Sequence, residues 1–226
     1  TEAQKEYLES VGQPPEANNK IRPAVETVLA NIAAASPEWD VRPIGKTDND
    51  LAYVCNQMLD WVWREADGDV CESIDFCEYY ARMAPELFER VRLGLFIGEY
   101  DQQFYQPRGV AAIISPWNFP MAICCGMTVA ALVTGNTVIV KPAGQTTGIA
   151  KLICEMLWEA GAPKDVLQFA CGPGSVIGSA FVRDPRVAII AFTGSKPVGL
   201  DILQASGQTP ENQPFVKKVI CEMGGK

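Results

Sequence analysis

From Gly109 onward the sequence alternates between short apolar runs and longer amphipathic segments. The apolar runs have the length of β-strands and lie at Val110–Ile114, Thr137–Val140, Val166–Ala170, Val187–Phe192 and Val216–Ile220. One amphipathic segment ends at Gly161, and its expected buried face consists of Ile149, Leu152, Ile153, Met156, Leu157 and Ala160. Short apolar strands joined by helices predict a parallel sheet with helices on both faces, an open α/β domain.

The residues before Gly109 have a different pattern. Residues 1–95 are acidic and helix-prone, which predicts an N-terminal helical region. Residues 96–108 alternate aromatic and polar side chains, a pattern typical of an extended arm or β-hairpin. The predicted organisation is therefore a helical region at 1–95, an arm at 96–108 and an α/β domain at 109–226.

Composition excludes several classes of partner. The net charge is −8 and no basic stretch is present, so we expect no nucleic-acid partner. The longest apolar stretch, Met121–Val133, is shorter than the about 20 residues of a membrane span, and we expect a buried helix there.

The N-terminus and the cysteines indicate the compartment. Residues 1–20 are polar and do not resemble a signal peptide, so we expect a cytoplasmic protein with reduced thiols. The chain has no His and no C-x-x-C pair among its eight cysteines, so we expect no metal site.

Because ligands of such sheets bind beyond the carboxyl ends of the strands, the loops that follow each strand are the informative ones. After the first strand, two prolines flank Asn118, whose amide is a preorganised donor of the kind that an oxyanion hole uses. The alternative is a Pro-rich turn in which Asn118 satisfies local backbone groups. The second strand leads into Lys141, which has the chemistry to contact a nucleotide but equally fits a solvated strand end.

Two glycine-rich turns and one carboxylate follow the later strands. Gly172, Gly174 and Gly178 follow the third strand with spacing G-x-G-x-x-x-G, which differs from the usual dinucleotide fingerprint. The fourth strand ends in Phe192-Thr193-Gly194-Ser195, with Gly199 five residues after Gly194, and this turn suits a pyrophosphate. The last strand delivers Glu222, a candidate general base, although a lone Glu is more often a surface residue.

Taken in order, PWNFP, KPA, the glycine turn, FTGS and EMGGK resemble the aldehyde dehydrogenase family, continuously from about Phe104 to Lys226. Upstream, residues 63–70 and 74–82 resemble the branch of that family that oxidises L-glutamate γ-semialdehyde (1-pyrroline-5-carboxylate dehydrogenases). The resemblance implies an open, Rossmann-like sheet that binds NAD, a small-molecule aldehyde substrate in proline catabolism and a homo-oligomer in the full-length form. Gly144 stands where many relatives carry a Glu that holds the cofactor ribose, so NADP remains an alternative.

The resemblance also implies residue roles. Asn118 would stabilise the oxyanion of a thiohemiacetal, and Glu222 would activate the water that hydrolyses the thioester. Cofactor contacts would come from Ser115, Trp117, Lys141, Gly174, Gly178, Phe192, Thr193, Gly194, Ser195, Gly199, Met223 and Gly224.

None of the eight cysteines matches the family's nucleophile, which follows EMGGK by several tens of residues. Cys124 and Cys125 lie on an apolar helix and are expected to be buried structural thiols. The sequence therefore predicts a fragment of a dehydrogenase that is inactive by itself. Two alternatives are a non-catalytic nucleotide-binding module and a structural protein that retains the fold.

Overall fold

The computed structural model describes residues 48–224, with side chains from Val62 onward. The residues from Ala66 onward form one compact unit. The helix α3 (Asp48–Phe88) leads into this unit and ends one turn after Pro85. Within residues 48–224, no helix combines the length and the apolar character that a membrane span requires. The expected helical region at 1–95 lies partly outside the described residues.

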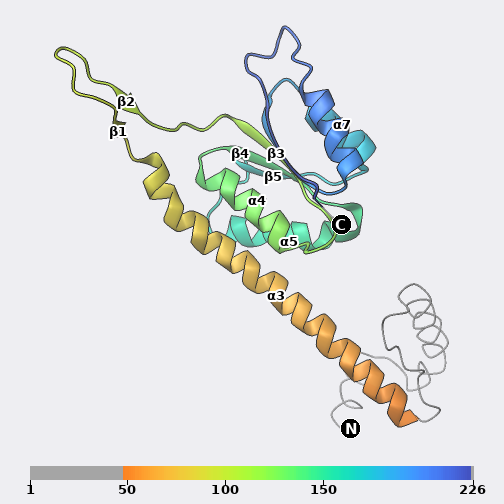
Figure 1. Ribbon diagram of the computed structural model, residues 1–226. Helices are drawn as coiled ribbons and strands as arrows, with labels where there is room; N and C mark the ends of the chain where they lie inside the picture. The colour runs from red at the N-terminus through yellow and green to blue at the C-terminus, as the bar shows by residue number, and fades with distance from the viewer. Residues whose placement is uncertain (1–47, 225–226) are drawn as a thin grey trace. The chain divides into compact units, whose positions relative to one another are not determined.

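A five-stranded parallel sheet forms the centre of the unit (Figure 1). Its strands, in the spatial order β5-β4-β3-β6-β7, are β5 (Leu167–Phe169), β4 (Thr137–Lys141), β3 (Val110–Ile114), β6 (Val187–Thr193) and β7 (Lys218–Glu222). Each neighbouring pair is parallel. The predicted open α/β sheet is therefore confirmed.

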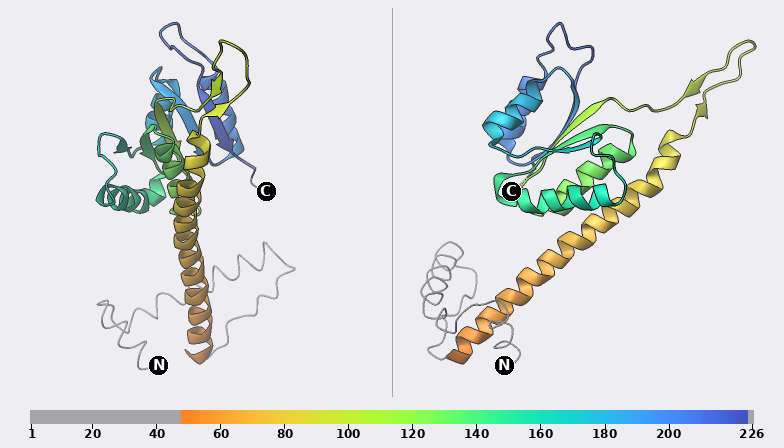
Figure 2. Two further views of the ribbon diagram at one scale, coloured as in Figure 1. Left: turned by 90° about the vertical axis from the view of Figure 1, so that its left-hand side faces the viewer. Right: turned by 180° about the vertical axis from the view of Figure 1, so that it is seen from behind.

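Helices cover both faces of the sheet (Figure 2). On one face lie α4 (Ala122–Val133) and α5 (Thr147–Glu159), packed on a core that includes Ala111, Ile113, Val138 and Val140. On the other face lie α6 (Ser179–Arg183) and α7 (Lys196–Ser206), packed on Ala112, Ile114, Ile190 and Phe192. Because side chains alternate along a strand, neighbouring residues of β3 contribute to opposite cores.

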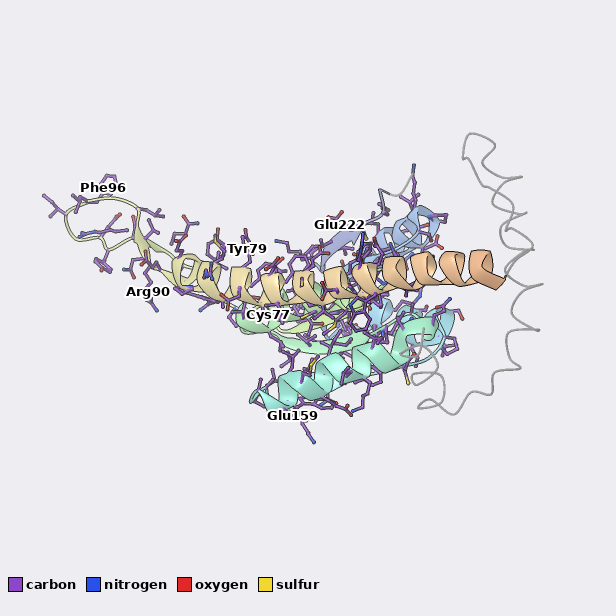
Figure 3. The ribbon with its side chains drawn as sticks, turned by 90° about the horizontal axis from the view of Figure 1, so that it is seen from below. Cys77, Tyr79, Arg90, Phe96, Glu159 and Glu222 are labelled. Carbon is purple, nitrogen blue, oxygen red and sulfur yellow. The ribbon has the colours of Figure 1, made fainter. Side chains whose placement is uncertain are left out.

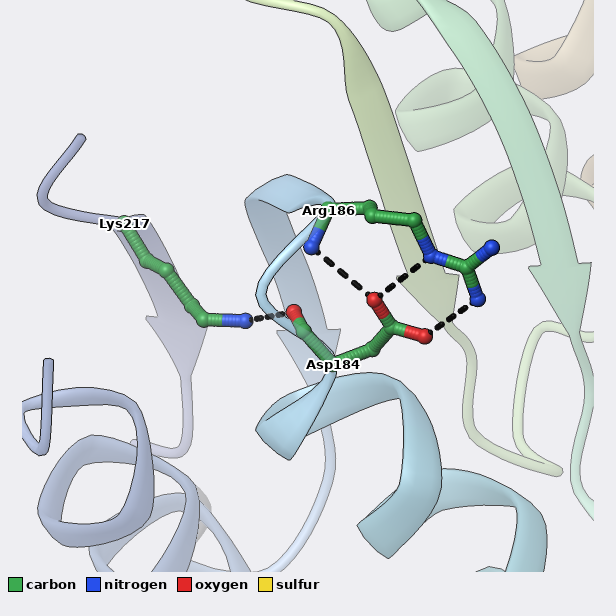
Figure 4. Close-up of polar contacts among 3 residues, drawn as sticks. All are labelled: Asp184, Arg186 and Lys217. Atoms are coloured by element: carbon green, nitrogen blue, oxygen red, sulfur yellow. Dashed lines mark hydrogen bonds and ion pairs between the residues drawn. The ribbon is translucent and has the colours of Figure 1, made fainter. Parts of the chain in front are cut away.

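Two sequence-based expectations need correction. The last strand was expected at Val216–Ile220 but runs from Lys218 to Glu222, and Val216 is 69% exposed. The reason is an anchor ahead of the strand, where Lys217 Nζ donates to the backbone oxygen of Asp184 (Figure 4). This contact holds residue 217 before the ladder with β6 begins at Lys218.

The buried face of α5 also differs from the expectation. Ile153 is buried and Leu157 packs against the same core, as predicted, but Ile149, Leu152 and Met156 are exposed, and the buried positions also include Ala150 and Cys154. The buried set has the helical spacing i, i+3, i+4, so the hydrophobic stripe is rotated relative to the predicted one.

A short hairpin precedes the sheet. β1 (Val91–Arg92) pairs antiparallel with β2 (Gln102–Gln103), and Leu93 N donates to Asp101 O at 3.1 Å. The hairpin extends away from the sheet (Figure 1). It begins in sequence before the predicted arm at 96–108 and closes within it.

Helix α4 begins at a carboxylate that comes from α3. Asp69 is 8% exposed, and its two carboxylate oxygens accept from Met121 N at 3.0 Å and Ala122 N at 2.8 Å. The first backbone N–H groups of a helix lack partners within the helix, so a carboxylate there satisfies donors and complements the helix dipole. Asp69 therefore fixes where α4 starts.

Candidate active site

A cleft of about 1300 Å³ opens at the carboxyl ends of the strands. Its walls come from the loops after β3, β4, β6 and β7, together with the glycine turn after β5 and residues of α6 and α7. The predicted site residues that line it are Ser115, Trp117, Asn118, Lys141, Gly174, Gly178, Phe192, Thr193, Gly194, Ser195, Glu222 and Gly224. Asn118 and Glu222 thus share one cleft with the candidate cofactor contacts.

The loop after β3 holds Asn118 at the cleft wall. Ser115 N donates to Lys141 O at 3.2 Å, which continues the pairing of β3 with β4 past the strand end. Phe119, directly after Asn118, has a φ of 47°, a left-handed conformation that is uncommon for a bulky residue. Such backbone is kept only where its surroundings enforce it, and here Asp69 fixes the chain at Met121. The Asn118 loop is therefore anchored at Met121 by Asp69.

Lys141 ends β4 with its side chain buried. It is 6% exposed, and Nζ donates to the carbonyl of Pro142 at 3.0 Å. Burial lowers the pKa of Lys141 from its ordinary value. A side chain at position 174 would begin 3.8 Å from Nζ, so Gly174 leaves the space beside the ammonium open. A polar ligand oxygen in the cleft would offer this group a further acceptor.

The turn after β6 is shaped by aromatic and sulfur packing. A Cβ at Gly194 would lie 2.6 Å from Cζ of Phe192, so this turn has no room for a side chain. Similarly, a Cβ at Gly199 would lie 2.5 Å from Sδ of Met223. Gly199 and Met223 do not line the cleft, unlike the other predicted residues. Instead, both the Met223 side chain and the Phe192 ring lie against Gly199.

Glu222 stands between the cleft and a second cavity. It is exposed, and its backbone oxygen accepts from Gly194 N at 3.0 Å. A groove of about 700 Å³, which we call the α3–α4 groove, is lined by Glu222, Phe192 and Thr193 and also by Phe76, Tyr80, Ile123, Gly126 and Met127. The groove is mostly apolar, whereas the cleft is mixed in character. The Glu222 carboxylate therefore lies where a polar and an apolar site meet.

Two charged residues of the cleft were not predicted from the sequence. Arg183 ends α6 and Asp201 lies in α7, and both line the cleft. Neither belongs to a strand-end loop, so no motif pointed to them. The role of Asp69 was also not predicted from the sequence, because the N–H groups that it binds are about 52 residues away in sequence.

The thiols near the site are buried, as the sequence suggested. Cys124 is fully buried, and burial raises its pKa, although the hydroxyls of Ser115 and Thr128 partly oppose this. Burial also raises the pKa of Cys125, with the neighbouring Cys77 adding to the effect. Both groups therefore favour the neutral thiol over the nucleophilic thiolate.

Among residues 62–224, no group of three or more potential metal ligands gathers in one place.

Comparison with known families decides the family of the chain. The sequence model of the aldehyde dehydrogenase family matches residues 42–226. The chain belongs to the aldehyde dehydrogenase family. The predicted resemblance is therefore confirmed. A second sequence model, that of phage P22-like portal proteins, matches residues 1–80, which is less than half of the chain. The two matches overlap at residues 42–80.

Curated relatives of this aldehyde dehydrogenase family member include 1-pyrroline-5-carboxylate dehydrogenases. Those of Geobacillus thermodenitrificans and Anoxybacillus flavithermus are each 48% identical over 164 residues, 73% of this chain and 32% of the relative. The chain thus spans about a third of the length of the curated relatives it matches.

Solved structures agree with this family. A 1-pyrroline-5-carboxylate dehydrogenase from Thermus with bound NAD has a TM-score of 0.70 and 43% identity, over 73% of this chain and 32% of that one. Proline utilization A from Bdellovibrio bacteriovorus, inactivated by N-propargylglycine, has a TM-score of 0.70 and 48% identity, over 72% of this chain and 17% of that one. Both likenesses support the α/β fold described above.

Proposed function

We propose that this chain supplies the cofactor-binding part of an NAD-dependent dehydrogenase that oxidises L-glutamate γ-semialdehyde to glutamate. The observation that carries the proposal is the shared cleft, in which Asn118 and Glu222 face the same space as Lys141 and both glycine turns. The relatives named 1-pyrroline-5-carboxylate dehydrogenase support the choice of substrate. Residues 109–226 would form the cofactor-binding domain, following the arm at 96–108.

The residues of the cleft fit a dinucleotide. Gly174 leaves open space beside the buried Lys141 ammonium, which would bind ribose or phosphate oxygens. Phe192 fills the space beside Gly194 and leaves no room for a Cβ there, and because Gly194 has no side chain, a ligand can approach its backbone closely. NAD, when bound, would supply a hydride acceptor. No atom lies within 4 Å of a Cβ built at Gly144, so the space beside this residue is open. NADP therefore stays an alternative cofactor.

Two side chains would act on the aldehyde. The Asn118 amide would donate a hydrogen bond to the oxyanion, and its anchored loop would avoid reorganisation during the reaction. The Glu222 carboxylate would take a proton from the water that releases the acid. Its place between the cleft and the apolar α3–α4 groove suits a base that reaches a substrate entering from the groove. We assign the nucleophile to neither Cys124 nor Cys125, because burial keeps both as thiols.

Calorimetric titration of this chain with NAD and with NADP tests cofactor binding. We expect NAD to bind, and Lys141→Ala to weaken binding at least about tenfold, the effect of losing one charge-assisted contact. Lys151→Ala is the matched control, because Lys151 is half-exposed on α5 and pairs with Glu155 at 2.7 Å, and the cleft lining does not include it. A folded chain that binds neither nucleotide would overturn the proposal.

The same chain tests the assignment of the nucleophile. With NAD and L-glutamate γ-semialdehyde we expect no NADH, because hydride transfer requires a covalent adduct that the buried thiols do not form. Turnover that Cys125→Ala abolished would show that the nucleophile lies on α4 after all. Binding of NAD without turnover also fits a non-catalytic nucleotide-binding module. A longer form that carries the family's nucleophile separates the two, because there Glu222→Gln should slow acid release more than hydride transfer.

A further inference from the structure

The contact between α3 and α4 brings two cysteines together. Sγ of Cys77 lies 3.7 Å from Sγ of Cys125, although the two residues are 48 positions apart in sequence. Cys77 lies on α3 (Figure 3) and is exposed, whereas Cys125 lies on α4 and is 5% exposed. The two sulfurs of a disulfide lie about 2.05 Å apart, so Cys77 and Cys125 are in contact but not bonded, and bond formation requires the two sulfurs to approach each other further.

Three neighbouring contacts hold the two helices in this arrangement. Asp69 binds the first backbone N–H groups of α4, and Cys125 Sγ lies 3.9 Å from the Ser73 carbonyl oxygen. A Cβ at Gly126 would lie 2.8 Å from the ring of Phe76, so the α4 backbone rests directly on that ring. Asp69, Ser73, Phe76 and Cys77 follow helical spacing along one side of α3. The thiols therefore meet at a fixed helix crossing rather than on a mobile loop.

We propose that Cys77 and Cys125 are an oxidation site, in which a hydroperoxide converts the two thiols into a disulfide that ties α3 to α4. The inference rests on the geometry of the two helices and is independent of the proposed dehydrogenase function. Cys77 and Cys125 have no part in the cleft or in the residues assigned to catalysis.

The exposure of the two thiols sets the order of the steps. The Cys77 sulfur attacks the peroxide, the O–O bond breaks, and Cys77 becomes a sulfenic acid while one water or alcohol leaves. The Cys125 thiol then attacks the Cys77 sulfur and loses its proton in the same step, the S–O bond breaks, and the departing hydroxide takes that proton and leaves as a second water. Two thiols lose two electrons in total and the hydroperoxide gains them. Cys125 is buried and favours the neutral thiol, so it does not react with the peroxide itself; it attacks the Cys77 sulfenic acid because the two sulfurs already lie 3.7 Å apart.

The disulfide would alter stability and one cavity wall. It would close a loop that contains the hairpin, β3 and the Asn118 loop, and closing a long loop restricts the unfolded chain. Phe76 and Gly126, the direct neighbours of the two cysteines in sequence, line the α3–α4 groove. Oxidation would therefore fix the two helices that wall this groove.

Treatment of this chain with hydrogen peroxide, followed by peptide mapping without reduction, tests the proposal. We expect a Cys77–Cys125 linked peptide, a melting temperature raised by about 5–10 °C, and reversal of both by dithiothreitol. Cys77→Ser should abolish the link and the shift without loss of folding, because residue 77 is exposed. Cys71→Ser is the matched control, since Cys71 is another exposed cysteine of α3, and this variant should behave like the parent.

A second variant keeps the test decisive. Cys125→Ala should leave Cys77 as a sulfenic acid that dimedone traps, whereas in the parent chain dimedone labelling of Cys77 should be transient. Cys77 sulfinic acid with an unmodified Cys125 in the parent would overturn the proposal. A disulfide from Cys77 to any other cysteine, within the chain or between two chains, would overturn it as well.

Discussion

At the residue scale, the proposed site contains the buried ammonium of Lys141 and the exposed carboxylate of Glu222. Lys141 donates to one backbone carbonyl and has its pKa lowered by burial, so it gains stability from a further oxygen in the cleft. Glu222 lies at the junction of the cleft and the α3–α4 groove. The buried Lys141 ammonium is suited to binding an oxygen of a dinucleotide. The solvent-exposed Glu222 carboxylate is suited to activating a water molecule.

Asp184 gives a pH-dependent prediction at the same scale. Its carboxylate accepts from Arg186 N and Nε, each at 2.9 Å, and from Nη2 at 2.6 Å, which lowers its pKa from 3.8 to about 2 (Figure 4). Because the folded-state pKa lies below the unfolded one, this stabilisation is complete above about pH 4 and is lost as the pH falls towards 2.

We expect Asp184→Asn to reduce the free energy of unfolding by about 1 kcal/mol at pH 7, a value discounted for solvent screening. Urea titrations at about pH 7 and about pH 3 measure the difference between the variant and the parent, which should shrink at the lower pH. Asp165→Asn, at an exposed position, is the control. A difference that stays constant between the two pH values would show that the Asp184 charge does not stabilise the fold.

Several site residues were predictable from sequence because strand ends place them. Asn118, Lys141 and Glu222 each follow an apolar run, and parallel strands bring such positions to one edge of a sheet. Arg183 and Asp201 were not predictable, because helix rotation decides which side chains face the cleft. The packing of Met223 against Gly199 could not be predicted from the sequence either, since the spacing of glycines does not show which of them makes room for a neighbouring side chain.

At the scale of elements, the start of α4 depends on α3. Met121, which precedes the helix, makes no capping hydrogen bond with its own side chain, and Asp69 provides the acceptors instead. We expect Asp69→Ala to lower the free energy of unfolding by about 2 kcal/mol, because it leaves buried N–H groups without partners. Urea denaturation measures this, with Asp67→Ala, at an exposed position of α3, as the control. Equal stability of the two variants would mean that water replaces the Asp69 cap.

Strand positions were predicted more accurately than the faces of helices. β3 matches its apolar run, since a buried central strand is apolar on both faces. β7 is displaced by two residues because Lys217 is held by Asp184, a contact from a different part of the chain. The stripe of α5 was predicted only in part, because apolar residues occur around more of that helix than the sheet covers. Local pattern thus identifies the elements, and long-range contacts set their ends and orientation.

At the scale of the whole molecule, apolar surface gathers on the hairpin. Leu95 is 82% exposed and Ile97 fully so, and Leu93, Phe96 and Tyr100 beside them are each more than half exposed. Exposed apolar patches of this kind mark association sites in soluble proteins. The hairpin extends away from the sheet (Figure 1), which leaves these side chains available to a second copy of the chain. The homo-oligomer expected from the family resemblance would use this surface.

We therefore expect the double substitution of Leu95 and Ile97 by Ser to weaken self-association at least about tenfold, because it removes two large side chains from an apolar contact. Sedimentation velocity over a range of concentrations measures the change. Circular dichroism should be unaltered, since neither side chain belongs to the two cores. Leu152→Ser is the control, because Leu152 is 48% exposed on α5, away from the hairpin. If this control weakened association as much as the hairpin variant, the contact would lie on the α5 face and the hairpin would not be the interface.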